Sequence, residues 1–302
     1  MKSPFHYLSV RSQSVLLLTT FGFVFMLSQF AFAGLLLAKF GSQEALSAVL
    51  SGAVQNESDF VFLLWMNALV QLFLALVTFV IGRYFFLKLE MKSWMKPGNP
   101  RFWMWAIFIL LAFIPLTYFI NSFIEPFIPA DWTTGQLEEN SNYFYEELTR
   151  MLSLHPLLIV FSTALVAPIT EEMMFRGFIQ QTVRNFTRSW QVGIWVGALL
   201  FALIHFNWAG FVPRFLLGAL LGYFAYWGKS LWPAIIAHAM FNSFSLILSA
   251  GGISDAQVSE TFSSLGLALA SLWIGVAGLI VMRKLYLREH VAEILQNAGG
   301  NN

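Results

Sequence analysis

Long apolar stretches separated by short polar segments run along the whole chain. Their lengths suit helices that cross a hydrocarbon core of about 30 Å, because an α-helix rises about 1.5 Å per residue. The pattern predicts eight such helices, the later ones short enough to form tight hairpins. They cover residues 14–38, 61–87, 103–124, 154–178, 192–207, 211–228, 231–249 and 264–282. The predicted fold class is therefore all-α, a polytopic transmembrane helical bundle.

The composition is that of an integral membrane protein. Of the 302 residues, 58% are hydrophobic and only 11% are charged. The formal net charge of +1 gives no indication of a nucleic-acid partner, so membrane lipids are the expected surroundings. The chain has no cysteine, which excludes disulfides, thiolate metal sites and a cysteine nucleophile.

The segments between the expected helices alternate in charge. One set is basic and contains Arg83, Lys88, Lys92, Lys96, Arg101, Arg184, Arg188, Lys229, Arg283, Lys284 and Arg288. The other set is acidic and contains Glu44, Glu57, Asp59, Glu125, Asp131, Glu138, Glu139, Glu146, Glu147, Asp255 and Glu260. The positive-inside rule then puts both termini in the cytoplasm, as an even number of spans requires. Short basic loops without organelle signals favour a bacterial inner membrane.

Three regions follow from this organisation. Residues 1–150 hold helices without a motif and an acidic outer loop, residues 151–290 form a helical core with the polar motifs, and residues 291–302 form a short flexible tail. The segment Ala31-Phe32-Ala33-Gly34 is similar to a signal-peptidase site. We expect an uncleaved anchor, because the apolar run before it is longer than the about 7–15 residues of a signal peptide.

Two adjacent glutamates stand inside the fourth apolar stretch. Glu171 and Glu172 are the only acidic residues in the expected spans, and Arg176 follows Glu172 by four residues. Positions four apart share a helix face, so Glu172 and Arg176 can pair while Glu171 points elsewhere. Pro168 lacks an N–H group and is expected to loosen the helix just upstream. Ionisable groups at membrane depth are rare and usually functional, so a structural ion pair does not account for the second glutamate.

Two later stretches each add a histidine. His205 follows Phe201 by four residues and His238 precedes Asn242 by four, so each pair shares one helix face. Either pair alone would be typical of hydrogen bonds between helices. Two histidines deep in the expected spans, downstream of the glutamates, together indicate a buried hydrolytic site.

Two mechanisms fit these residue types. A carboxylate and an imidazole can deprotonate a water molecule, while a second imidazole and an amide donate hydrogen bonds to an oxyanion. Glu171, His205 and His238 could instead hold a zinc ion, with Asn242 near a fourth position. The residue types do not separate the two mechanisms.

These motifs, in this order and on separate helices, resemble those of the CPBP intramembrane proteases. That family includes type II CAAX prenyl endopeptidases and bacterial bacteriocin-processing or immunity (Abi-like) proteins. Its pattern of Glu-Glu-x-x-x-Arg, Phe-x-x-x-His and His-x-x-x-Asn is found within residues 168–245. The resemblance implies that Glu171 and His205 activate water, that His238 and Asn242 stabilise the oxyanion, and that Arg176 orients Glu172, with Phe201 in support. It also favours a metal-free glutamate peptidase over an obligatory zinc site.

We therefore expect an intramembrane endopeptidase that cleaves a membrane-associated or lipid-anchored peptide near the cytoplasmic face. One alternative is a proton-coupled secondary transporter in which Glu171, His205 and His238 relay protons. The first half of the chain does not repeat the glutamate motif, which counts against a transporter. The other alternative is a non-catalytic immunity or scaffold protein that uses the same site for binding.

The expected spans place the site residues at unequal depths. Counted at about 1.5 Å per residue, Glu171 and His238 lie about 10 Å from the basic face and His205 about 20 Å. Tilt, or a fifth helix that begins in the cytoplasm at about 188–191, would bring them together.

Overall fold

Every regular element in the described part of the chain is a helix. The computed structural model describes residues 5, 7–42, 56–82, 91–128, 149–205, 208, 210–253 and 255–299. The N-terminal elements are α1 (Val10–Phe40), α3 (Glu57–Val80), α4 (Met91–Trp94), α5 (Pro100–Ile124) and η2 (Glu125–Phe127). A central helix follows as α7 (Pro156–Ile159), η3 (Val160–Val166), α8 (Ala167–Glu172), η4 (Met173–Ile179) and α9 (Gln180–Thr187). The last elements are α10 (Trp190–Leu203), α11 (Phe211–Gly228), α12 (Trp232–Ala250), α13 (Asp255–Phe262) and α14 (Leu265–Gly299).

The predicted class, a helical membrane bundle, is confirmed, and each expected apolar stretch contains a helix. Six helices in the described part of the chain are long and apolar enough to cross a membrane, and Trp190–Leu203 is a shorter apolar helix. Large hydrophobic side chains such as Phe23, Phe73 and Trp273 are exposed on the outer surface, as expected of a surface in contact with lipid. The number of spans stays a prediction. The expected acidic loop falls largely on residues 129–148, outside the described residues.

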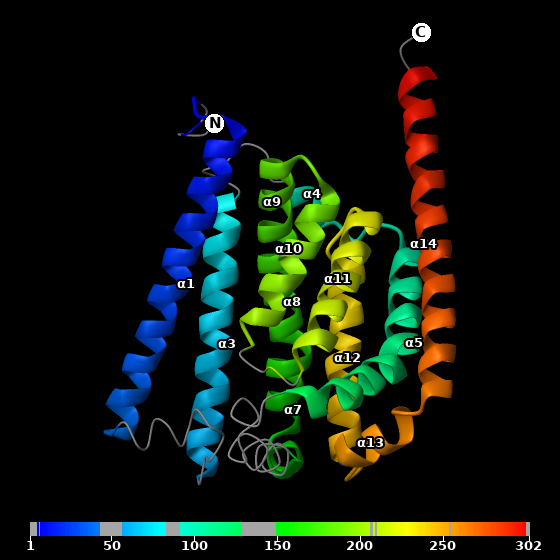
Figure 1. Ribbon diagram of the computed structural model, residues 1–302. Coiled ribbons are helices and arrows are strands. Elements are labelled where there is room, and N and C mark those ends of the chain that lie inside the picture. Colours follow the sequence, from blue (N-terminus) through cyan, green and yellow to red (C-terminus); the bar gives the residue numbers. More distant parts are fainter. Residues whose placement is uncertain are drawn as a thin grey trace.

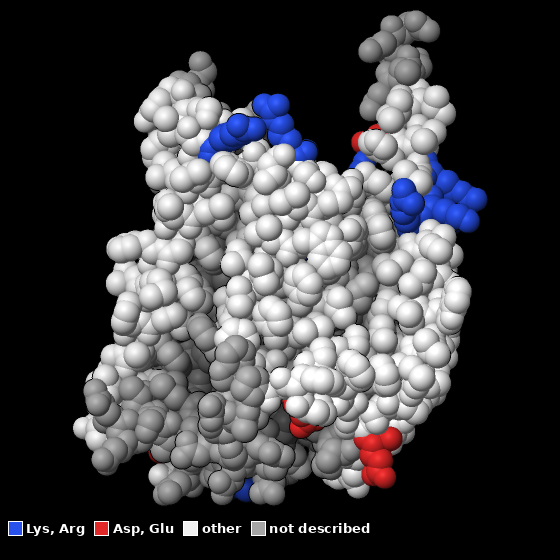
Figure 2. Space-filling model, viewed as in Figure 1, with Lys and Arg blue, Asp and Glu red and all other residues white. Residues whose placement is uncertain are grey.

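The two ends of the bundle differ in charge, and both termini lie at the same end. Figure 1 shows the start of α1 and the end of α14 at one end of the molecule. Figure 2 shows most of the visible Lys and Arg side chains at that end and acidic side chains mainly at the other. This arrangement agrees with the predicted charge pattern, while the assignment of the basic end to the cytoplasm stays a prediction. The C-terminal helix continues to Gly299, so the expected tail is helical as far as that residue.

The helices α10 and α11 form a hairpin whose turn lies within the height of the bundle, whereas the other long helices reach further toward the acidic end (Figure 1). With 14 residues, α10 extends about 21 Å, less than a hydrocarbon core of about 30 Å. Both ends of the hairpin are at the basic end, where α10 begins at Trp190 and α11 ends at Gly228. The hairpin therefore carries the residues of its turn to mid-depth.

The central helix lies between two packed groups of side chains. On one side, α5, α11, α12 and α14 bury residues such as Phe102, Phe224 and Met282. On the other side, α1, α3 and α10 pack Leu17, Leu74 and Phe201 against η4 and α9. The polar residues of the central helix are thereby held between these groups.

Candidate active site

The carboxylates lie on a short α-helical segment between two π-helical ones. Six residues form α8, and η3 and η4 flank it on either side. Pro168 is in the first turn of α8, directly after η3, and its missing N–H removes one regular helical bond there. π-helical segments are rare and occur frequently at functional sites. The helix is thus wider than a regular α-helix just before Pro168, in the π-helical segment η3, as the sequence predicted.

Glu172 and Arg176 form the predicted pair in the interior of the protein. Glu172 Oε1 is 3.1 Å from Arg176 Nη1, and the side chains are 0% and 2% exposed. Arg176 Nη2 donates a hydrogen bond of 2.9 Å to the carbonyl of Gly218 on α11. The pair therefore joins the central helix to the hairpin, and a buried charge at either position has an opposite charge beside it.

His238 lies between the two glutamates. Its Nδ1 is 3.0 Å from Glu172 Oε1, and its Nε2 is 3.8 Å from Glu171 Oε2. The imidazole is buried, while 14% of the Glu171 side chain is exposed. Two carboxylates and one guanidinium leave one excess negative charge beside the imidazole. His238 is thus in contact with a fully buried carboxylate on one side and a partly exposed one on the other.

Phe201 connects the histidines. Its ring centroid is 5.0 Å from that of His205 and 5.8 Å from that of His238, both edge to face. The Arg176 guanidinium carbon lies 4.8 Å from the Phe201 ring centroid, a cation–π contact. His205 Nδ1 is 2.7 Å from the Phe201 carbonyl oxygen, so it carries the hydrogen, and Nε2 is left as an acceptor.

Asn242 holds α12 against the π-helical segment η3. Its Nδ2 donates a hydrogen bond of 2.8 Å to the carbonyl of Thr163. One amide hydrogen is therefore engaged away from the glutamates, and the second is left for other partners. Direct contacts join five of the predicted site residues, namely Glu171, Glu172, Arg176, Phe201 and His238. The hydrogen bond of Asn242 goes instead to the Thr163 carbonyl.

Glu171 and His205 line one cavity of about 620 Å³. Its walls come from α1, α3, the central helix and the turn after α10. Most of the wall is apolar, with Phe25, Phe30 and Leu74 among its side chains. A carboxylate and an imidazole thus face a common space large enough for water and part of a peptide.

The first half of the chain contributes three polar side chains that the sequence analysis missed. Gln29 on α1 and Asn67 and Gln71 on α3 line the same cavity. Gln71 Oε1 accepts a hydrogen bond of 2.9 Å from Thr170 Oγ1, next to the glutamates. The signal was present in the sequence, since Asn67 and Gln71 are polar residues four apart within an apolar stretch.

The depth mismatch in the sequence analysis came from an incorrect helix end. The fourth stretch does not end at residue 178, because Gln180–Thr187 continue the central helix. Glu171 then lies about 24 Å before the end of α9, and His205 about 22 Å after the start of α10. The two residues therefore reach equal depth. The expected start of the fifth helix agrees with Trp190.

The donor geometry does not fit a metal ion. No group of three or more His, Asp or Glu side chains converges closely enough to hold one among the residues that the structure describes. The zinc ion that the residue types allow therefore lacks a converging set of ligands in this part of the chain.

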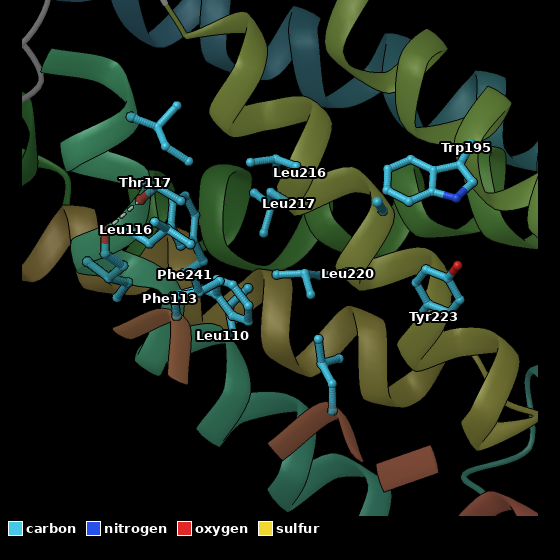
Figure 3. Close-up of a pocket in the computed structure, with 15 residues that line it drawn as sticks. Leu110, Phe113, Leu116, Thr117, Trp195, Leu216, Leu217, Leu220, Tyr223 and Phe241 are labelled. Carbon is cyan, nitrogen blue, oxygen red and sulfur yellow. Dashed lines mark hydrogen bonds between the residues drawn. The ribbon is translucent and has the colours of Figure 1, made fainter. Parts of the chain in front are cut away.

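A second cavity, of about 480 Å³, lies along α11 and is almost entirely apolar. Figure 3 shows Thr117 at one end, Trp195 and Tyr223 at the other, and Leu216 and Leu220 between them. None of the glutamates and histidines described above lines it. This cavity therefore lacks the groups that a hydrolytic reaction needs.

Comparisons with known proteins agree with the predicted resemblance. Residues 153–244 match a family model described as type II CAAX prenyl endopeptidase Rce1-like. The uncharacterized protein YpbD of Bacillus subtilis (strain 168) is 32% identical over 89 residues, which are 28% of this chain and 42% of that protein. The chain thus matches less than half the length of this relative. No solved structure matches the chain.

Proposed function

Because residues 153–244 form an Rce1-like domain of the CPBP family of intramembrane proteases, we propose that the protein is a glutamate-type intramembrane endopeptidase. The observation that carries this proposal is the position of Glu171 and His205, which come from different helices and line one cavity. A carboxylate and an imidazole in one water-accessible space are the groups that general-base activation of water needs.

In the proposed reaction, Glu171 accepts one proton of a water molecule. The second hydrogen of this water forms a hydrogen bond to His205 Nε2. The water oxygen attacks the carbonyl carbon of the peptide bond and produces a tetrahedral oxyanion. Glu171 then returns the proton to the amide nitrogen, the carbon–nitrogen bond breaks, and an acid and an amine leave. The hydrogen bond from His205 Nδ1 to the Phe201 carbonyl supports this role, because it leaves Nε2 as the acceptor.

The oxyanion is stabilised by His238, with the second amide hydrogen of Asn242 in support. Contact with Glu172 orients the His238 ring, and Nε2 is the ring nitrogen on the side of Glu171. Arg176 holds Glu172 in place through the buried ion pair. Donors that are fixed before the reaction stabilise developing charge without reorganisation, which is the usual reason for burying such a network.

The proposed substrate is a membrane-associated or lipid-anchored peptide. The apolar wall of the cavity suits a segment that enters from the bilayer, and Gln29, Asn67 and Gln71 offer hydrogen bonds to its backbone. We propose a bacterial inner membrane with the basic end of the molecule in the cytoplasm. The reaction then takes place within the bilayer, about 22–24 Å from that end and deeper than the sequence predicted.

The proposal is tested with proteoliposomes that contain a library of membrane-anchored peptides. Wild-type protein, Glu171→Ala, His205→Ala and the control Glu260→Ala, which changes an acid remote from the cavity, are compared by mass spectrometry of new peptide ends. We expect cleavage by wild type and Glu260→Ala, and a loss of at least about a hundredfold in the other two.

All variants should insert into the membrane to the same extent. Cleavage at the same bonds by both Glu171→Ala and His205→Ala would show that the assignment is wrong. Substrate counterflow that Glu171→Gln abolishes would favour a transporter, and a cellular phenotype unchanged in Glu171→Ala would favour a scaffold.

A further inference from the structure

A pocket at the basic end of the molecule is lined by three arginines from two helices. Its volume is about 520 Å³, and its lining residues are Ser9, Val10, Arg11, Arg184, Asn185 and Arg188. It lies between the start of α1 and the end of α9, where Figure 2 shows a group of basic side chains. No acidic side chain is among its lining residues.

Among the residues that the structure describes, no acidic side chain balances the positive charge in this pocket. Within the described part of the chain, no carboxylate forms an ion pair with Arg11, Arg184 or Arg188. Arg184 donates a hydrogen bond of 2.9 Å to Asn185 Oδ1, and its guanidinium carbon lies 4.8 Å from the Trp190 ring centroid. These contacts orient the guanidinium without neutralising it, so the arginines of α1 and α9 repel each other across the pocket.

Helix dipoles account for only part of the cluster. Arg184 and Arg188 are at the C-terminal end of α9, where a positive charge is favourable. Arg11 is in the first turn of α1, where the dipole favours a negative group and no acidic residue is present. The N-terminal end of α1 therefore adds backbone N–H donors to a pocket that already contains guanidinium groups.

The backbone at Arg188 supports a role for its side chain. Arg188 has φ 61° and ψ 22°, the left-handed conformation that favours glycine at the end of a helix. An arginine is strained at this position, and the helix would end as well with glycine. The strain is explained if the pocket needs a third guanidinium.

We propose that Arg11, Arg184 and Arg188 bind the phosphate group of an anionic phospholipid and that this phosphate joins α1 to α9. Guanidinium groups pair with phosphate oxygens through two parallel hydrogen bonds, and the positive charge of three of them favours a lipid with a net negative charge over a zwitterionic one. Val15 follows Arg11 by one helical turn, and Phe186 directly follows Asn185. Both apolar side chains are exposed and offer a surface for the acyl chains. Basic pockets on the cytoplasmic side of helical membrane proteins bind such headgroups.

The position of the pocket also links it to the cavity. The helix α9 continues η4 and α8, which carry Glu171, and α1 forms one wall of the cavity of about 620 Å³. A phosphate that joins α1 to α9 would fix the width of the cavity at its basic end. This consequence rests on the proposed function, whereas phosphate binding itself does not.

The test is native mass spectrometry of the full chain with phosphatidylglycerol or phosphatidylcholine. Arg11→Gln and Arg188→Gly are compared with Arg101→Gln, which removes an exposed arginine at the same end of the molecule but outside the pocket. We expect wild type and Arg101→Gln to bind one phosphatidylglycerol at least about tenfold more tightly than phosphatidylcholine. The two pocket variants should lose this preference.

Arg188→Gly separates a ligand role from a structural one. Because glycine relieves the strained backbone, this variant should have an unchanged or higher Tm in lipid-free detergent while its lipid preference is lost. Equal preference in all four proteins would overturn the proposal. Displacement of phosphatidylglycerol from wild type by millimolar inorganic phosphate would identify a soluble phosphate as the ligand and overturn the lipid assignment.

Discussion

At the scale of single residues, the two adjacent glutamates have different surroundings and therefore different expected roles. Glu172 is fully buried between Arg176 and His238, whereas Glu171 faces the cavity. The four-residue spacing predicted the Glu172–Arg176 pair, because it depends only on helix geometry. The contacts of His238 with Glu172 and of Asn242 with Thr163 join distant segments, so no local pattern could reveal them.

This difference predicts opposite effects on stability. Glu172→Gln leaves Arg176 as a buried charge without its partner and should lower the free energy of unfolding by about 3–5 kcal/mol. Glu171→Gln removes the excess negative charge and should leave stability unchanged or raise it. Thermal unfolding in detergent measures both, and equal destabilisation by the two substitutions would argue against separate roles.

At the scale of helices, the account depends on close contact between α10 and α11. Apolar stretches predicted the helices themselves, because an apolar segment within the hydrocarbon core must satisfy its backbone hydrogen bonds internally, as a helix does. The end of the central helix was mispredicted because Gln180, Gln181 and Thr182 are polar but buried. Hydropathy cannot distinguish a polar segment in water from one packed against other helices.

Close packing of the hairpin predicts a strong effect at Gly218. A Cβ at this position would lie 3.0 Å from Ala198 Cα, and the Gly218 carbonyl accepts the hydrogen bond from Arg176. Gly218→Ala should therefore destabilise the protein by about 1–3 kcal/mol. The control Gly22→Ala has no atom within 4 Å of the new Cβ and should be neutral or slightly stabilising. Equal Tm values for the two variants would contradict this packing.

At the scale of the whole molecule, the hairpin decides the topology. If α10 and α11 reach only mid-depth, six helices cross the membrane, and both six and eight crossings leave the termini on one side. The sequence could not decide between them, because the apolar stretches 192–207 and 211–228, of 16 and 18 residues, are typical of either short spans or a re-entrant hairpin.

Cysteine labelling can separate the two topologies, since the chain has no native cysteine. In sealed vesicles, a membrane-impermeant thiol reagent should label Ser12→Cys only from the cytoplasmic side and Ser259→Cys only from the opposite side. Trp208→Cys, in the turn after α10, should not be labelled from the outer face. Labelling of Trp208→Cys from the outer face would instead favour eight complete crossings.

The central claim is that Glu171 activates water for peptide hydrolysis without a metal ion, and one measurement tests it most directly. Purified wild type and Glu171→Gln are placed in lipid nanodiscs and mixed with a cleavable membrane-anchored peptide, with the protein in excess over the peptide. Single-turnover cleavage rates are recorded with and without a zinc chelator. The account predicts the same wild-type rate with and without chelator, and a rate at least about a hundredfold lower for Glu171→Gln. A wild-type rate that is lost on chelation and restored by zinc, or an unchanged rate in Glu171→Gln, would contradict it.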